Sequence, residues 1–174
     1  ILMLGCIILN KKERTLIVLP PALLQQWKKC IDRFLFGHQA FIFHGKNSKI
    51  SKKELEKKPI VLTTYGMIAT RHREYESLLW KIHWDRLIFD EAHHLRNHKT
   101  NACKGAFKLT ANIKWMITGT PIQNKKSDIR ILFGLLGKLI KGDKHLKKCI
   151  SQFLLRRTKK SVGISCMIYI AWNG

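Results

Sequence analysis

The stretch best suited to chemistry is IFDEAHHL, at Ile88–Leu95, where two adjacent carboxylates follow an apolar segment. Asp90 and Glu91 are two of only 11 acidic residues in a chain with 33 lysines and arginines. At the end of a buried strand, one acid can hold Mg²⁺ through water, and the next can orient and deprotonate an attacking water molecule. The same pair could instead begin a helix, where acids interact favourably with the helix dipole. The two acids alone do not distinguish these interpretations.

Short apolar runs alternate with stretches of helical periodicity along the chain. Apolar and β-branched residues predict strands at 15–20, 40–44, 60–65, 86–89 and 114–121. Helical spacing predicts helices at 22–35, 75–84, 127–140, with Ser127 as its cap, and 144–160, besides a loop and short helix at 45–58. This alternation indicates an α/β fold with a mostly parallel sheet. Because the strands are apolar almost throughout, we expect helices on both faces.

Polar residues gather where these strands end. In a parallel sheet of this class, ligands bind beyond the carboxyl ends of the strands. Asp90 and Glu91 follow one strand, and hydroxyl side chains at Thr63–Thr64 and Thr118–Thr120 end two others. The sequence therefore predicts a polar site at this edge of the sheet.

The charge of the chain indicates a polyanionic partner. Its 174 residues are 45% hydrophobic and 25% charged, which is typical of a folded domain and argues against disorder. The formal net charge of +22 favours polyanions, of which nucleic acid is the first candidate. Alternatively, the lysines only keep the surface soluble.

Cysteine spacing and hydropathy limit the remaining classes. Five scattered cysteines lack zinc-ligand spacing, which indicates reduced thiols of an intracellular protein. The apolar stretch 1–10 is shorter than the roughly 18 residues that a membrane-spanning helix requires. We interpret it as a buried helix or strand cut from a longer chain, and we expect no membrane association.

Several segments, in this order, resemble the Swi/Snf family of DNA-dependent ATPases. DEAH, at Asp90–His93, resembles the Walker B box of superfamily-two helicases. The matching segments are LIVLPPALLQQW (16–27), VLTTYGMI (61–68), WDRLIFDEAHHLRN (84–97), ITGTPIQN (117–124) and FLLRRTKK (153–160). The resemblance implies a RecA-like lobe of the P-loop NTPase type over residues 1–160, followed by a divergent tail at 161–174.

The resemblance implies roles for both acids and one histidine. Asp90 matches the residue that orders Mg²⁺ through water, and Glu91 matches the residue that activates the attacking water. His93 matches the residue that links the ATP site to the DNA-sensing loops. Alternatively, His93 is a histidine at a helix start that bonds to the backbone. The implied cofactors are ATP and Mg²⁺.

Other residues match segments that couple hydrolysis to movement or approach DNA. The coupling segment comprises Gly119, Thr120, Pro121, Gln123 and Asn124, although its first residues could form an ordinary turn. The DNA-facing segments comprise Thr63, Thr64, Tyr65, Arg156 and Arg157. β-Propensity would also explain the first three, and the arginines could contact a second lobe or only solvent. We expect Trp27 to pack in the core rather than to touch DNA.

Two parts of the family's motor have no counterpart in the sequence. No segment fits GxxxxGK[ST], the loop whose backbone N–H groups and lysine hold phosphates. The second RecA-like lobe, which carries the arginine finger, has no match either. We therefore expect a fragment that begins just after the phosphate-binding loop.

Two hypotheses from different classes follow. The first is part of the ATPase motor of a Swi/Snf-like translocase, of chromatin-remodelling or DNA-repair type, with duplex DNA and a second lobe as partners. We expect no sequence preference in DNA binding, because the matching segments suit phosphate contacts. The second hypothesis is a non-catalytic basic module that binds nucleic acid without hydrolysing ATP. We expect an intracellular protein, nuclear in a eukaryote.

Overall fold

The computed structural model describes residues 2–10, 12–35, 37, 39–71, 76–119, 126–156 and 168–173. Within these residues, seven strands form one sheet in the order β2-β3-β1-β4-β5-β7-β6. The strands are β1 (Thr15–Leu19), β2 (Ala40–Ile42), β3 (Ile60–Thr64), β4 (His83–Phe89), β5 (Thr110–Thr118), β6 (Leu154–Arg156) and β7 (Ile168–Asn173). The first five are parallel, and β7 pairs antiparallel with β5 and β6. The predicted α/β fold with a mostly parallel sheet is confirmed.

Along the chain, α-helices and 3₁₀ turns connect these strands or precede them. The α-helices are α1 (Leu2–Leu9), α2 (Leu24–Phe34), α3 (Lys52–Glu56), α4 (Tyr65–Ile68), α5 (Asn101–Phe107), α6 (Lys126–Leu135) and α7 (Gly142–Phe153). The 3₁₀ turns are η1 (Pro21–Leu23), η2 (Gly45–Ser48), η3 (Leu78–Lys81) and η4 (Ala92–Leu95). None of the described helices is long and apolar enough to cross a membrane. The four cysteines of the described part, at positions 6, 30, 103 and 149, are free thiols.

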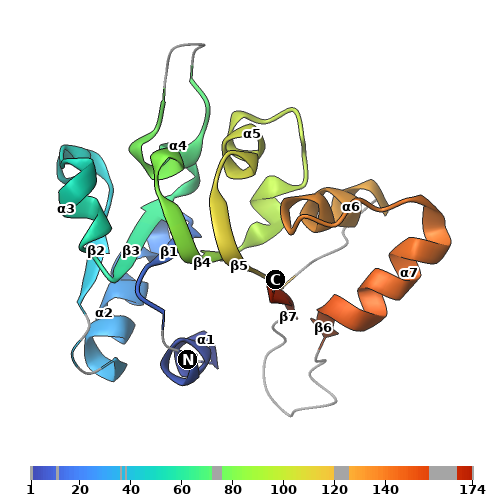
Figure 1. Ribbon diagram of the computed structural model, residues 1–174, viewed down its shortest axis with the longest axis horizontal. Helices are drawn as coiled ribbons and strands as arrows, with labels where there is room; N and C mark the ends of the chain where they lie inside the picture. Colours follow the sequence, from blue (N-terminus) through green and yellow to red (C-terminus); the bar gives the residue numbers. More distant parts are fainter. Residues whose placement is uncertain are drawn as a thin grey trace.

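The sheet has a separate hydrophobic core on each face, because successive side chains of a strand point to opposite sides. On β1, Ile17 and Leu19 pack with α1 and α2, whereas Leu16 and Val18 pack with the core that contains α4 to α7. Figure 1 shows α1 and α2 on one side of the central strands, with α4 and α5 on the other. Helices on both faces therefore explain why the strands are apolar almost throughout.

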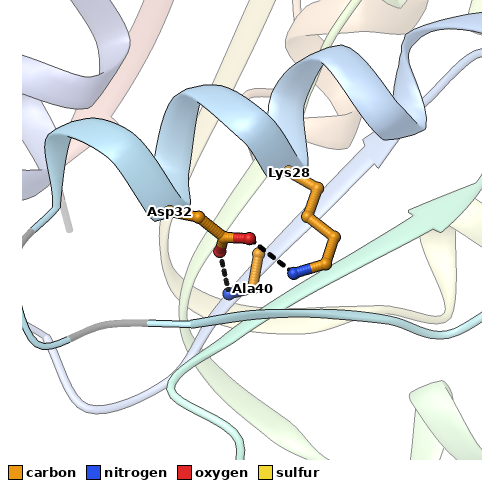
Figure 2. A network of polar contacts seen from close by, with 3 residues as sticks. All are labelled: Lys28, Asp32 and Ala40. Atoms are coloured by element: carbon orange, nitrogen blue, oxygen red, sulfur yellow. Dashed lines mark hydrogen bonds and ion pairs between the residues drawn. The ribbon is translucent and has the colours of Figure 1, made fainter.

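Local signals set the position of helix α2 against the sheet. Pro21 begins the turn η1, where its missing N–H costs nothing, and α2 follows directly. Near the other end of α2, the Asp32 carboxylate binds the Lys28 ammonium at 2.6 Å and accepts a hydrogen bond from the Ala40 amide at 3.2 Å (Figure 2). The Lys28 contact is the main reason that the pKa of Asp32 is lowered. This pair ties α2 to the first residue of β2.

Three predicted elements differ from the structure. The helix expected at 75–84 is replaced by η3 and by β4, which begins at His83, because pairing with β5 outweighs the local helical pattern. Ser127 is not an N-cap, since α6 already includes Lys126, and its hydroxyl donates to the Asp128 carboxylate. The basic helix expected to reach residue 160 ends at Phe153, where the chain continues as strand β6.

Candidate active site at the carboxyl end of β4

The two acids lie beyond the carboxyl end of β4, between its neighbours β1 and β5. Phe89, the last residue of β4, is in register with Val18 of β1 and Met116 of β5. The backbone amide of Asp90 donates to the Val18 carbonyl at 2.8 Å, which continues the ladder by one residue. Asp90 therefore leaves the sheet at a position fixed by a neighbouring strand.

Asp90 is held by three further hydrogen bonds. Its carboxylate oxygen Oδ2 accepts from the Trp27 indole Nε1 at 2.8 Å, and Oδ1 accepts from the Glu91 amide at 3.0 Å. Its carbonyl oxygen accepts from the Tyr65 hydroxyl at 2.6 Å. With only 7% of Asp90 exposed, burial raises the pKa of its carboxyl, and the bonds from Trp27 and Glu91 oppose that rise. The side chain is thus a buried, oriented carboxylate.

Glu91 differs from its neighbour in both backbone and exposure. Its φ of 51° and ψ of 47° make it the only non-glycine residue with a positive φ in the described part of the chain. That left-handed conformation costs about 1–2 kcal/mol for a residue with a Cβ. Its side chain remains 41% exposed, with Oε2 3.0 Å from Nδ1 of His93. The strained turn therefore places the second carboxylate at the surface, beside a histidine.

Two histidines and a tyrosine stack behind this turn. The rings of His93 and His94 lie 4.5 Å apart, and the His94 ring lies 5.1 Å from that of Tyr65. Burial, followed by the neighbouring His93, lowers the pKa of His94. Burial also raises the pKa of the Tyr65 hydroxyl, with Asp90 as the next cause. His94 is therefore biased towards the neutral form, and Tyr65 remains a donor to the Asp90 carbonyl.

The hydroxyls predicted to face DNA are engaged within the protein. The Thr63 hydroxyl donates to the Phe43 carbonyl at 2.9 Å, and the Thr64 hydroxyl lies 3.4 Å from Nδ1 of His44. Both threonines are almost fully buried, as is Tyr65. These side chains join the ends of β2, β3 and β4, and a role of this segment in DNA contact stays a prediction.

Other predicted residues are only partly described. Gly119 follows β5, and a Cβ built on it would meet no atom within 4 Å. Thr120, Pro121, Gln123, Asn124 and Arg157 lie outside the described residues, as does the side chain of Arg156. The coupling role of this segment therefore also stays a prediction.

Trp27 contacts the site, and the sequence did not indicate this contact. It is half-buried against the α1–α2 core, as expected, yet its N–H points at a carboxylate 63 positions away in sequence. Its helical spacing from the buried Ile31 marks the inward face of α2, which was the available signal. Spacing along the chain gave no sign of the partner.

The Asp90 carboxylate suits a Mg²⁺ ion bound through water. A carboxylate offers about four acceptor positions, and two of these take the bonds from Trp27 and Glu91. The others remain for metal-bound water, and oxygen is the ligand that Mg²⁺ prefers. Among the described residues, no group of three or more His, Cys, Asp or Glu side chains could hold a metal ion directly. The free acceptor positions of Asp90 therefore fit the water ligands of a hydrated ion.

The parallel sheet, covered on both faces and with an acid pair beyond a central strand, defines a RecA-like lobe. The chain belongs to the SNF2-related domain family, whose sequence model matches residues 2–168. It is 32% identical, over 86% of its length, to the DNA repair protein RAD5B of Arabidopsis thaliana and to transcription termination factor 2 of Drosophila melanogaster. The chain spans only 14% and 16% of these two relatives.

Solved structures agree with this assignment. The Sulfolobus solfataricus SWI2/SNF2 ATPase core in complex with dsDNA matches 92% of the chain, with a TM-score of 0.73 and 26% identity, and the chain covers 37% of it. The S. solfataricus SWI2/SNF2 ATPase core domain, at 24% identity and a TM-score of 0.63, has the same fold over 94% of the chain. The expected Swi/Snf resemblance is therefore confirmed.

Proposed function

We propose that the chain is part of the ATPase motor of a Swi/Snf-like translocase, which couples ATP hydrolysis to movement along duplex DNA. The observation that carries the proposal is the contrast between the adjacent acids. Asp90 is buried and held by four hydrogen bonds through its backbone and side chain, whereas the side chain of Glu91 is 41% exposed on a strained turn. The contrast suits one acid that is held in place to order a hydrated ion and one that can reach an attacking water molecule.

Each residue would then perform a separate task. Bound ATP and Mg²⁺ would supply the reactive phosphoryl group and a charge that neutralises it. Asp90 would orient the ion's water ligands with its two free acceptor positions. Glu91 would accept a proton from the attacking water, and His93, 3.0 Å from it, would connect the turn to the DNA-sensing loops. Gly119, Thr120, Pro121, Gln123 and Asn124 would couple the reaction to movement.

We also propose duplex DNA as the polymer along which the motor moves. The net charge of +22 supports a polyanionic partner, and a matching SWI2/SNF2 core was solved with dsDNA. Thr63, Thr64 and Tyr65 would contribute backbone groups rather than hydroxyls, together with Arg156 and Arg157. Such phosphate contacts carry little sequence information, and affinity should fall steeply with salt through counterion release. Binding measured at several salt concentrations on two unrelated duplexes tests this, and a flat response would contradict it.

The family resemblance also suggests how the chain is divided and where the protein acts. Residues 1–160 would form one lobe that works against a second RecA-like lobe, and 161–174 would be a divergent tail whose strand β7 pairs with β5 and β6 of that lobe. The relatives named for DNA repair and transcription termination support an intracellular and, in a eukaryote, nuclear location. A fusion of residues 2–156 to the remaining parts of the S. solfataricus core tests the motor assignment. It should release phosphate from ATP faster with duplex DNA, and no DNA-dependent release would contradict the proposal.

A second candidate function applies to residues 1–174 by themselves. The sequence contains no GxxxxGK[ST] segment, the loop that anchors the triphosphate. An arginine finger contributes about 10³–10⁵ to the rate in related enzymes. Without that finger and without the anchor for the triphosphate, we expect these residues to bind nucleic acid and not to hydrolyse ATP. The test is phosphate release with Mg²⁺ and saturating duplex DNA, with Asp90→Asn/Glu91→Gln as the control. DNA-stimulated release that the double substitution abolishes would contradict this expectation.

A further inference from the structure

Trp27 reaches Asp90 because of how α2 is connected to the sheet. Strand β1 ends at Leu19, and the short turn η1 leads directly into α2. Since β1 is the neighbour of β4, the first turns of α2 lie beside the residue that follows β4. The indole nitrogen of Trp27 is consequently 2.8 Å from Oδ2 of Asp90.

The orientation of α2 is set independently of this contact. Ile31, one turn after Trp27, is completely buried and fixes the inward face of the helix. Lys28 and Asp32 lie on a second side, where Asp32 binds the backbone of Ala40 (Figure 2). Trp27 therefore presents its N–H from a helix that is anchored at two other points.

The indole group suits an ionised carboxylate. An indole N–H can only donate, and a deprotonated carboxylate can only accept, so the contact favours the charged form of Asp90. Trp27 and the Glu91 amide bond to different oxygens, which fixes the rotation of the carboxylate about its last bond. The remaining acceptor positions consequently point in defined directions.

We propose that Trp27 is a positioning residue that orients the Asp90 carboxylate for a hydrated Mg²⁺ ion. The inference rests on the proposed function, because it takes Asp90 as the residue that holds the ion. Hydrogen-bonded partners of metal-binding groups commonly act in this way, and their loss weakens metal binding or activity by roughly 10–100-fold. Trp27 acts through Asp90 and has no contact of its own with the reacting groups.

The contact itself is tested by the indole N–H resonances of the 174-residue chain in ¹⁵N–¹H spectra. Asp90→Asn keeps the shape of the side chain and removes its charge, so the Trp27 resonance should move. The indole of Trp84 donates to the Leu79 carbonyl at 3.1 Å. Trp84 lies near the start of β4, at the opposite end of the strand from Asp90, so its resonance should stay in place. An unmoved Trp27 resonance would overturn the proposal.

The effect on the ion is tested with Mn²⁺ as a paramagnetic probe. Mn²⁺ should broaden the amide signals of Glu91 and Ala92, and Trp27→Phe should raise the concentration needed for half-maximal broadening about tenfold. Trp84→Phe, which also removes one indole hydrogen bond, should leave that concentration unchanged. Thermal unfolding of both variants shows whether each is folded at the temperature of the measurement.

The outcomes separate the two proposals. If Asp90→Asn abolishes the broadening and Trp27→Phe leaves it unchanged, Trp27 is not a positioning residue and the role of Asp90 survives. If Asp90→Asn leaves the broadening unchanged, Asp90 does not hold the ion and both proposals fall. If the unsubstituted chain shows no broadening, the positioning role falls, and the role of Asp90 is decided by Mg²⁺-dependent ATP binding in the fusion. The positioning role is supported only if Trp27→Phe raises the Mn²⁺ concentration needed for half-maximal broadening and Trp84→Phe leaves it unchanged.

Discussion

On each face of the sheet, a basic side chain from a strand donates a hydrogen bond to a carbonyl at the end of a helix, and the residue differs between the faces. On the α1–α2 face, the buried guanidinium of Arg86 donates to the Asn10 carbonyl, just after the end of α1. On the other face, the Lys114 ammonium donates to the carbonyl of Leu135, the last residue of α6, at 3.2 Å. The final carbonyls of a helix lack partners within it and carry partial negative charge. Each face thus places a cation from a neighbouring strand at a helix end.

A glycine of α5 and a glycine of α1, on opposite faces of the sheet, differ in the space around them. On one face, a Cβ built at Gly105 of α5 would lie 1.7 Å from the carbonyl oxygen of Ile68, at the end of α4. A Cβ built at Gly5 of α1, on the other, would meet nothing within 4 Å. Asp90 is bound from both sides, through its carbonyl by Tyr65 of α4 and through its carboxylate by Trp27 of α2. A residue of one face therefore holds the backbone of Asp90, and a residue of the other face orients its side chain.

The largest expected difference in the free energy of unfolding is that between alanine substitutions at Gly105 and at Gly5. Gly105→Ala should lower the free energy of unfolding by about 3 kcal/mol or more, because the methyl group would overlap a carbonyl that cannot move alone. Gly5→Ala should raise it by up to about 1 kcal/mol, because alanine is the better helix former and has room. Urea unfolding measures both. Similar values for the two variants would contradict the difference in packing.

A smaller effect is expected from the buried cation of the α1–α2 face. Arg86→Ala should cost about 2–4 kcal/mol, since it leaves a void and removes the donor to the Asn10 carbonyl. Hydrogen exchange should show the loss first in α1, whose end Arg86 holds. Arg33→Ala, on the exposed side of α2, is the control and should change stability by about 0.5 kcal/mol at most. Wild-type protection of α1 in the Arg86 variant would argue against this anchoring role.

The cation of the other face should give the smallest effect and one that depends on pH. Burial lowers the pKa of Lys114 in the folded chain below 10.5, the value of a free lysine. At a pH between the folded pKa and 10.5, the unfolded chain therefore binds more protons than the folded chain. The charged Lys114 lowers the free energy of unfolding at pH values below its folded pKa. This cost disappears as the pH rises to 10.5. Lys114→Met should be at most about 1 kcal/mol more stable near neutral pH, and this gain should shrink in alkali. A constant difference across that range would exclude titration of Lys114 as its cause.

Much of the fold was predictable because it follows from local patterns. The apolar runs at 15–20, 60–65 and 114–121 became β1, β3 and β5 because strands covered on both faces are apolar throughout. Helix α5 was not predicted, since NACKGAF has little amphipathic pattern and depends on the cap by Thr100 and on the contact of Gly105 with α4. The strand β7 was missed for a similar reason, because its antiparallel pairing with β5 is a long-range contact.

The site was predictable in outline only. That Asp90 and Glu91 lie beyond a strand end follows from the apolar run before them. The left-handed backbone of Glu91 and the contact of Trp27 with Asp90 are tertiary features, and nothing in residue type or spacing specifies them. Thr63 and Thr64 show the converse, since hydroxyls at a strand end suggested an exposed role and their partners are internal.

The most direct test of the roles of Asp90 and Glu91 compares the two acids in the fusion of residues 2–156 with the remaining parts of the S. solfataricus core. Steady-state phosphate release with duplex DNA and Mg²⁺-dependent ATP binding are measured for Asp90→Asn and Glu91→Gln. We predict that Glu91→Gln binds ATP like the unsubstituted fusion and hydrolyses it about 10²–10⁴-fold more slowly, as expected for loss of a general base. Asp90→Asn should also lose Mg²⁺-dependent binding. Unchanged turnover in Glu91→Gln would contradict the assignment of the exposed acid as the base.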